Sequence, residues 1–109
     1  MHIRMHFNDG IAADALRTYV DRRLRFALAR FGRRVGEITV RIRPDGPSGN
    51  HCRISAEVLP FGEVAIEQAD SDLFTAIDRA TSKLGRQFSR ELERMRDARV
   101  GRESVRLAA

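Results

Sequence analysis

The sequence has 109 residues, 42% of them hydrophobic, which suits one domain with a modest core and leaves little room for two. Its net charge of +5 and pI of about 10.9 favour polyanionic partners: nucleic acid, an anionic membrane surface or an acidic protein. The single cysteine, Cys52, excludes an internal disulfide and a cysteine-based zinc site, and no apolar run is long enough to span a membrane. Because the N-terminus lacks a signal-peptide pattern, we expect a cytoplasmic protein.

Hydrophobic periodicity predicts six elements along the chain. Alternating apolar residues indicate four strands and helical spacing indicates two helices, in the order strand 2–7, helix 14–31, strands 37–43, 51–59 and 63–69, and helix 70–99. Turn-forming residues separate the strands, at 8–10, 44–50 and 60–62. A short sheet with one polar face needs its other face covered, so we predict an α+β, two-layer βαβββα sandwich: a four-stranded sheet with two helices on one face.

The second helix, 70–99, is the longest element and has two opposed stripes. Its apolar stripe is expected to face the core: Leu73, Ile77, Ala80, Leu84, Phe88, Leu92 and Met95. Asp70 or Ser71 is expected to cap its start. Residues 1–99 are therefore predicted to form the domain, and residues 100–109, which show no pattern, to form a flexible tail.

The opposite stripe of this helix is a row of four cations, Arg79, Lys83, Arg86 and Arg90. The first helix adds Arg22, Arg25 and Arg33, whereas 54–78 carries six acids and no lysine or arginine. Because both helices should cover the same sheet face, we expect their outward sides to merge into one basic surface. A solvated helix face is the alternative, and the excess of arginine over lysine fits either phosphate binding or a GC-rich genome.

Aromatic residues are few, namely Tyr19 and six phenylalanines, and the pattern places most of them in the core. This argues against recognition of single strands by stacked bases and favours recognition of folded RNA by shape and backbone. Arg4, Arg41 and Arg53 fall on the outward side of their strands, and whether they join the basic surface is open.

The residues that could carry catalysis are not arranged in a known motif. His2, His6 and His51 lack the spacing of a metal site, and Cys52 is expected to point into the core, away from its neighbour His51. We therefore predict no enzyme, no metal, no cofactor and no small-molecule substrate.

Segment 71–79, Ser-Asp-Leu-Phe-Thr-Ala-Ile-Asp-Arg, resembles the Asp-Leu-Tyr-Ala-Ala-Ile-Asp signature of the ribosome hibernation promoting factor and ribosome-associated inhibitor A family, some of whose members are called sigma-54 modulation proteins. Segments 16–24 and 46–54 are also similar to that family, although Asp45 and Asn50 depart from its Asn-Gly-Pro-x-Gly-Gly turn and Ala13 replaces the usual helix cap. The resemblance spans about residues 1–97.

The resemblance implies a fold similar to a double-stranded RNA-binding domain and a role as a translation inhibitor in stationary phase or stress. It implies binding to rRNA of the small ribosomal subunit near the decoding centre, where the protein blocks tRNA and mRNA. The family's RNA-binding positions correspond to Arg79, Lys83, Arg86 and Arg90, with Arg22 and Arg25 as further candidates.

Several alternatives stay open at this stage. The chain could be a divergent member that acts as a protein-binding regulator without ribosome binding, or a small enzyme that uses Cys52 or a histidine. Long members carry a C-terminal dimerisation domain, for which this sequence has no room. The oligomeric state, and whether the protein promotes or opposes ribosome dimerisation, are therefore left undetermined.

Overall fold

The computed structural model describes the backbone of residues 1–7 and 13–108, and their side chains up to residue 98 apart from residue 48. The elements follow in the expected order: β1 (His2–Phe7), α1 (Ala13–Leu28), a 3-10 segment η1 (Ala29–Arg34), β2 (Val35–Pro44), a short 3-10 turn η2 (Gly46–Ser48), β3 (Asn50–Val58), β4 (Gly62–Asp70) and α2 (Leu73–Ala108). The turn expected at 8–10 lies outside the described residues.

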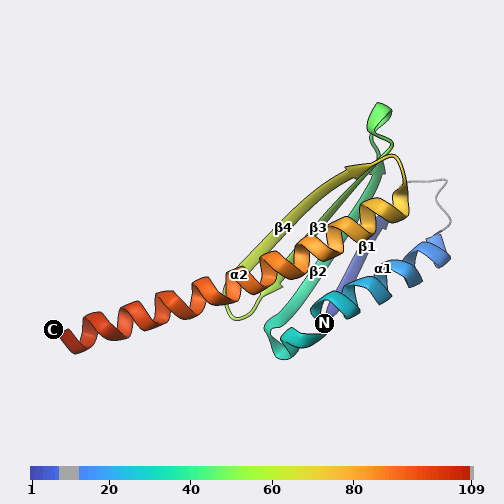
Figure 1. Ribbon diagram of the computed structural model, residues 1–109. Helices are drawn as coiled ribbons and strands as arrows, with labels where there is room; N and C mark the ends of the chain where they lie inside the picture. The colour runs from blue at the N-terminus through green and yellow to red at the C-terminus, as the bar shows by residue number, and fades with distance from the viewer. Residues whose placement is uncertain (8–12, 109) are drawn as a thin grey trace.

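The four strands form one sheet in the order β1-β2-β3-β4. β1 pairs with β2 in parallel, because α1 carries the chain back between them, whereas β2, β3 and β4 pair antiparallel through short turns. Both helices cover the same face of this sheet, and the other face is open (Figure 1). The predicted α+β, βαβββα sandwich is confirmed.

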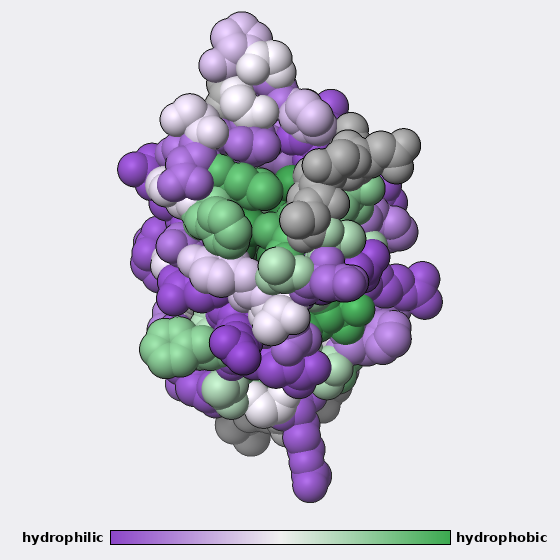
Figure 2. Space-filling view, turned by 90° about the vertical axis from the view of Figure 1, so that its right-hand side faces the viewer, coloured by the Kyte–Doolittle hydropathy of each residue, from purple (hydrophilic) through white to green (hydrophobic). Residues whose placement is uncertain are grey.

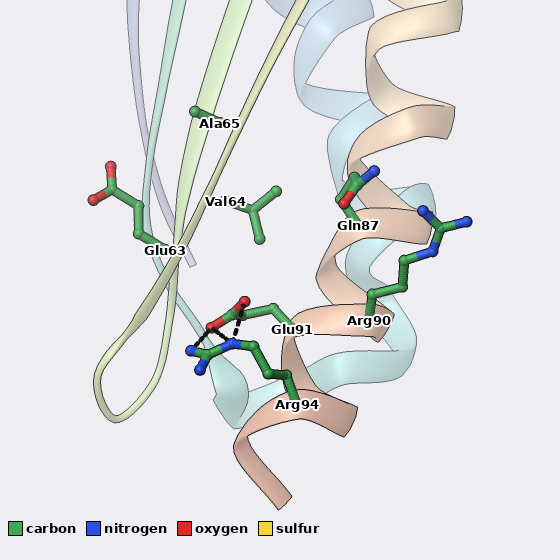
Figure 3. A pocket seen from close by; sticks show the side chains of 7 residues that line it. All are labelled: Glu63, Val64, Ala65, Gln87, Arg90, Glu91 and Arg94. Carbon is green, nitrogen blue, oxygen red and sulfur yellow. Dashed lines mark hydrogen bonds and ion pairs between the residues drawn. The ribbon is translucent and has the colours of Figure 1, made fainter. Parts of the chain in front are cut away.

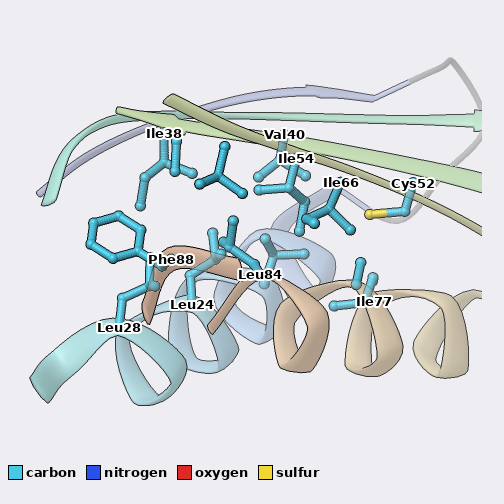
Figure 4. Packing of buried hydrophobic residues seen from close by; sticks show 14 of the residues in the cluster. Leu24, Leu28, Ile38, Val40, Cys52, Ile54, Ile66, Ile77, Leu84 and Phe88 are labelled. Carbon is cyan, nitrogen blue, oxygen red and sulfur yellow. The ribbon is translucent and has the colours of Figure 1, made fainter. Parts of the chain in front are cut away.

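The core lies between the sheet and the two helices, where the inward side chains of β2, β3 and β4 meet one stripe from each helix (Figure 4). Phe88, Leu84 and Ile77 of α2 are fully buried, as are Leu24 and Leu28 of α1. The Phe88 ring stacks on Phe31 of η1, with ring centroids 4.6 Å apart. Burial of each such side chain stabilises the fold by about 1.5–3 kcal/mol.

The first helix ends earlier than its periodicity suggests. α1 stops at Leu28, and the chain continues as η1, in which Gly32 has φ 50°. Glycine adopts a positive φ at little cost, so the kink within η1 falls at this residue.

The second helix differs from the expectation at both ends. Its cap is Asp72, not Asp70 or Ser71: the Asp72 carboxylate accepts hydrogen bonds from the Phe74 backbone N–H at 3.1 Å and from the Thr75 hydroxyl at 3.0 Å. At the other end α2 continues past residue 99 to Ala108 and extends beyond the sheet (Figure 1). Whether residues 100–109 are flexible in solution stays a prediction.

Among the helices of the described residues, none is apolar over a length that could cross a membrane.

Candidate nucleic-acid interface

The four cations of α2 lie on the side of the helix that faces away from the core. All four cations, Arg79, Lys83, Arg86 and Arg90, are exposed. The apolar stripe on the opposite side of α2 is buried. Arg79 lies nearest to an acid: its Nη1 is 3.4 Å from Oδ2 of Asp70, the last residue of β4. The structure thus brings these four predicted residues together in one row, which we call the α2 row.

A groove lies between helix α2 and strand β4. Its volume is about 470 Å³, and it is lined by Glu63, Val64, Ala65, Gln87, Arg90, Glu91 and Arg94 (Figure 3). Within it, Arg94 pairs with Glu91, and this hydrogen bond holds the pKa of the Glu91 carboxyl below its usual value. The Arg90 guanidinium points away from that pair in Figure 3, so it is available to a ligand outside the groove.

Arg22 and Arg25 lie at the other edge of the sheet. Together with residues of β1, including His2 and Met5, they line a hollow of about 520 Å³. Nε of Arg25 is 2.8 Å from Oδ2 of Asp21, one helical turn earlier, so part of its charge is compensated. Figure 2 shows that this side of the molecule is mainly hydrophilic, with apolar residues in several separate patches.

The six predicted site residues therefore fall into two groups. The ion pair of Arg79 with Asp70 and the groove position of Arg90 place the α2 row beside β4, whereas Arg22 and Arg25 lie beside β1. Since β1 and β4 are opposite edges of the sheet, these contacts do not bring the two groups together, and their merging into one basic surface stays a prediction.

The seam between α1 and α2 contains contacts that the sequence did not reveal. The Tyr19 hydroxyl of α1 donates a hydrogen bond to the Asp78 carboxylate of α2, and Arg23 Nε lies 3.1 Å from Oδ1 of the same carboxylate. Phe74 packs edge-on against Tyr19, with ring centroids 4.8 Å apart. These contacts fix how the α2 row is held relative to α1. No local pattern signals them, because 59 residues separate Tyr19 from Asp78.

The aromatic residues divide between the core and the surface. Tyr19, Phe7, Phe31 and Phe88 lie in the core or pack against it, as expected for most of the seven aromatic residues. Phe26 on α1 is 82% exposed, Phe61 in the β3–β4 turn is 83% exposed and Phe74 is 48% exposed. Only Phe88 is fully buried, while Phe7 and Phe31 are half-buried. The exposed rings of Phe26, Phe61 and Phe74 provide surfaces on which bases can stack.

The residues considered for catalysis do not form a reactive site. Cys52 is fully buried in the core, and this burial raises the pKa of its thiol to about 12. A thiol in that state is protonated at neutral pH and is a poor nucleophile. Within residues 1–7 and 13–108, no three histidine, cysteine or acidic side chains come together as a metal site would require.

Comparisons with known proteins agree with this arrangement. The family model described as sigma 54 modulation protein / S30EA ribosomal protein matches residues 3–96. The N-terminal domain of Protein Y from Thermus thermophilus has 29% sequence identity and a TM-score of 0.71, over 83% of this chain and 98% of that domain. A ribosomal subunit interface protein from Coxiella burnetii, 19% identical, has the same fold with a TM-score of 0.71, over 83% of this chain and 96% of its own. No curated protein matches the sequence. The family match covers most of the chain, which therefore belongs to the sigma 54 modulation protein / S30EA ribosomal protein family.

Proposed function

We propose that this protein is a ribosome hibernation factor that binds rRNA of the small ribosomal subunit near the decoding centre and blocks tRNA and mRNA. Its family is ribosome-associated and non-enzymatic, which supports a mechanism based on binding alone. One structurally similar protein is described as a ribosomal subunit interface protein, which supports the ribosome as the partner. Such a factor works in the cytoplasm, in stationary phase or under stress.

The α2 row is the observation that carries this proposal. Lys83, Arg86 and Arg90 have no ion-pair partner among the residues that the structure describes, and Arg79 has a weak one at 3.4 Å. Exposed cations without acidic partners are free to contact phosphates, and each contact releases counterions from the RNA. Arginine can also bind a phosphate through two hydrogen bonds at once.

The proposed mechanism is steric and electrostatic. The buried stripe of α2 anchors the helix to the sheet, so the α2 row is presented from a rigid support. Once its cations hold the rRNA backbone, the body of the domain fills space that tRNA and mRNA need. Arg22 and Arg25, at the β1 edge, form a second, separate contact in this proposal.

Co-sedimentation of the purified protein with its own small ribosomal subunits, over a range of salt concentrations, tests the proposal. We expect saturable binding that tRNA competes and that weakens with salt. The quadruple variant Arg79→Gln, Lys83→Gln, Arg86→Gln and Arg90→Gln should lower the slope of log K against log salt by roughly 2.8–3.6, because about 0.7–0.9 is lost per phosphate contact.

A matched pair of single variants controls for charge alone. Arg86→Gln removes a cation of the α2 row, whereas Arg94→Gln removes an exposed arginine of the same helix that is paired with Glu91. Arg86→Gln should weaken binding more than Arg94→Gln. Equal effects of the two, or a quadruple variant that binds like the wild type, would refute the role of the α2 row.

A protein-binding regulator is the second candidate function. The observation that favours it lies at the β3–β4 turn, where the exposed Phe61 ring stands beside the acidic residue Glu63. Association with a partner protein that survives RNase treatment, together with no binding to ribosomes, would establish this alternative.

A further inference from the structure

The sheet face that no helix covers carries its own cluster of arginine and histidine side chains. Strand pairing sets His6, Arg41 and Arg53 side by side in one row across β1, β2 and β3, and sets Arg43 opposite His51 in a neighbouring row. Directly opposed side chains in a sheet have Cβ atoms about 4.5–5.5 Å apart. We call these five residues the open-face cluster.

This arrangement is unfavourable for the isolated protein, because like charges that face each other across strands destabilise a sheet. Two arginines of this face are compensated: Arg4, outside the cluster, has its Nε 3.0 Å from Oε1 of Glu37, and Arg53, within it, has its Nη1 2.7 Å from Oε1 of Glu67. Arg41 and Arg43 have no such partner in the described part of the chain.

Glu67 lies directly opposite Arg53 in the pairing of β3 with β4, so it is the acid nearest to the cluster in this row. The pKa of its carboxyl is lowered, chiefly by the hydrogen bond from Arg53 and further by the charges of His51 and Arg43. One carboxylate is therefore shared among several cations. The remaining acids of this face, Glu37, Glu57 and Glu63, lie at its other end, around a shallow hollow of about 280 Å³.

We propose that the open-face cluster is a second surface that binds RNA phosphates, separate from the α2 row. This inference rests on the proposed function, which supplies an RNA-rich partner. Three arginines fit phosphates because a guanidinium donates two parallel hydrogen bonds to them. The phosphates of a bound RNA backbone would also give Arg41 and Arg43 the negatively charged partners that they lack within the described part of the chain.

The placement of the two surfaces has a geometric consequence. The residues of the α2 row are exposed on the helical layer, whereas the open-face cluster belongs to the strands. Both helices lie on one side of the sheet (Figure 1). The Cα atoms span only 18 Å along the shortest principal axis. A straight RNA helix cannot contact both sides, so the domain is inserted between two RNA segments.

The test compares the double variant Arg41→Gln/Arg43→Gln with a control that also removes two exposed arginines, Arg4→Gln/Arg94→Gln, both of which are ion-paired. Binding to small subunits is measured across salt concentrations, and thermal unfolding is measured in parallel. The open-face variant should bind about tenfold more weakly at moderate salt, with a slope reduced by about 1.4–1.8. Its melting temperature should stay equal or rise, since like-charge repulsion is removed.

The outcomes separate this inference from the proposed function. If the wild-type protein does not bind small subunits, the proposed function is wrong. If the wild type binds and the α2 row variant is weakened, but the open-face variant binds like the wild type, only the second surface is wrong. Binding to ribosomal proteins freed of RNA is measured as well. If Arg41→Gln/Arg43→Gln weakens this binding as much as it weakens binding to intact small subunits, the partner of this face is an acidic protein and the RNA assignment is wrong.

Discussion

The Tyr19 hydroxyl donates a hydrogen bond to the Asp78 carboxylate, and this contact joins α1 to α2 across their seam. Tyr19 is half-buried and also packs against Phe74, so the ring and the hydroxyl both hold α1 against the start of α2. The orientation of the α2 row relative to α1 thus depends on a residue that carries no charge.

Replacing Tyr19 by phenylalanine should lower the free energy of unfolding by about 1 kcal/mol, because the ring contacts remain and one hydrogen bond is lost. Urea denaturation measures this change. The double variant with Asp78→Asn should show less than the sum of the two single losses, since both substitutions remove the same contact. Additive losses would mean that the contact does not couple the helices.

The same hydrogen bond predicts a dependence on alkaline pH. The bond to Asp78 is the main reason that the Tyr19 pKa is raised above its usual value of 10.0. Folding therefore favours the neutral phenol, so this stabilisation is complete below pH 10 and is lost as the pH rises through the folded-state pKa. The stability gap between wild type and Tyr19→Phe should narrow above pH 10, and a constant gap would contradict this cause.

Asp72→Ala should destabilise the protein by about 1 kcal/mol, because it removes the acceptor for the Phe74 N–H at the start of α2. Asp72→Ser should retain most of the stability, since serine also caps helices. Equal unfolding midpoints for the alanine and serine variants would show that the cap contributes little.

Gly49→Ala should cost about 2 kcal/mol or more. The backbone φ of 86° disfavours any side chain, and a Cβ there would lie 2.6 Å from Cα of Ser71. Gly46→Ala is the matched control, because its φ is also positive, at 47°, but nothing lies within 4 Å of its Cβ. The control should show only the conformational cost, about 1 kcal/mol. Thermal unfolding of both variants measures the difference.

The Cys52 thiol should resist iodoacetamide at pH 8 in the folded protein, because burial raises its pKa to about 12 and excludes the reagent. In urea, where the chain is unfolded, it should react at the rate of a free thiol. Rapid stoichiometric labelling of the native protein would show that this part of the core opens readily.

The sequence predicts the elements well wherever one periodicity dominates. Alternation sets the bounds of β1 at His2–Phe7, and the apolar stripe of α2 from Ile77 to Phe88 is buried as expected. The end of α2 was missed because the stripe stops at Met95, and a helix without an apolar stripe carries no periodic signal.

The candidate site was only partly predictable. The α2 row follows from spacing along a single helix, but the separation of Arg22 and Arg25 from it depends on which sheet edge each helix covers. The open-face cluster depends on cross-strand register, which places Arg41 opposite Arg53 and Arg43 opposite His51. Neither relationship is encoded in a local window of sequence.

The parallel pairing of β1 with β2 has a consequence for the order of folding. β2, β3 and β4 are joined by short turns and can pair locally. β1 pairs with β2 only after the intervening chain, which includes α1 and η1, has closed into a loop. Closing this longer loop costs more chain entropy before any contact is gained, so β1 should join last. In pulse-labelled amide exchange during refolding, β3 and β4 should become protected before β1.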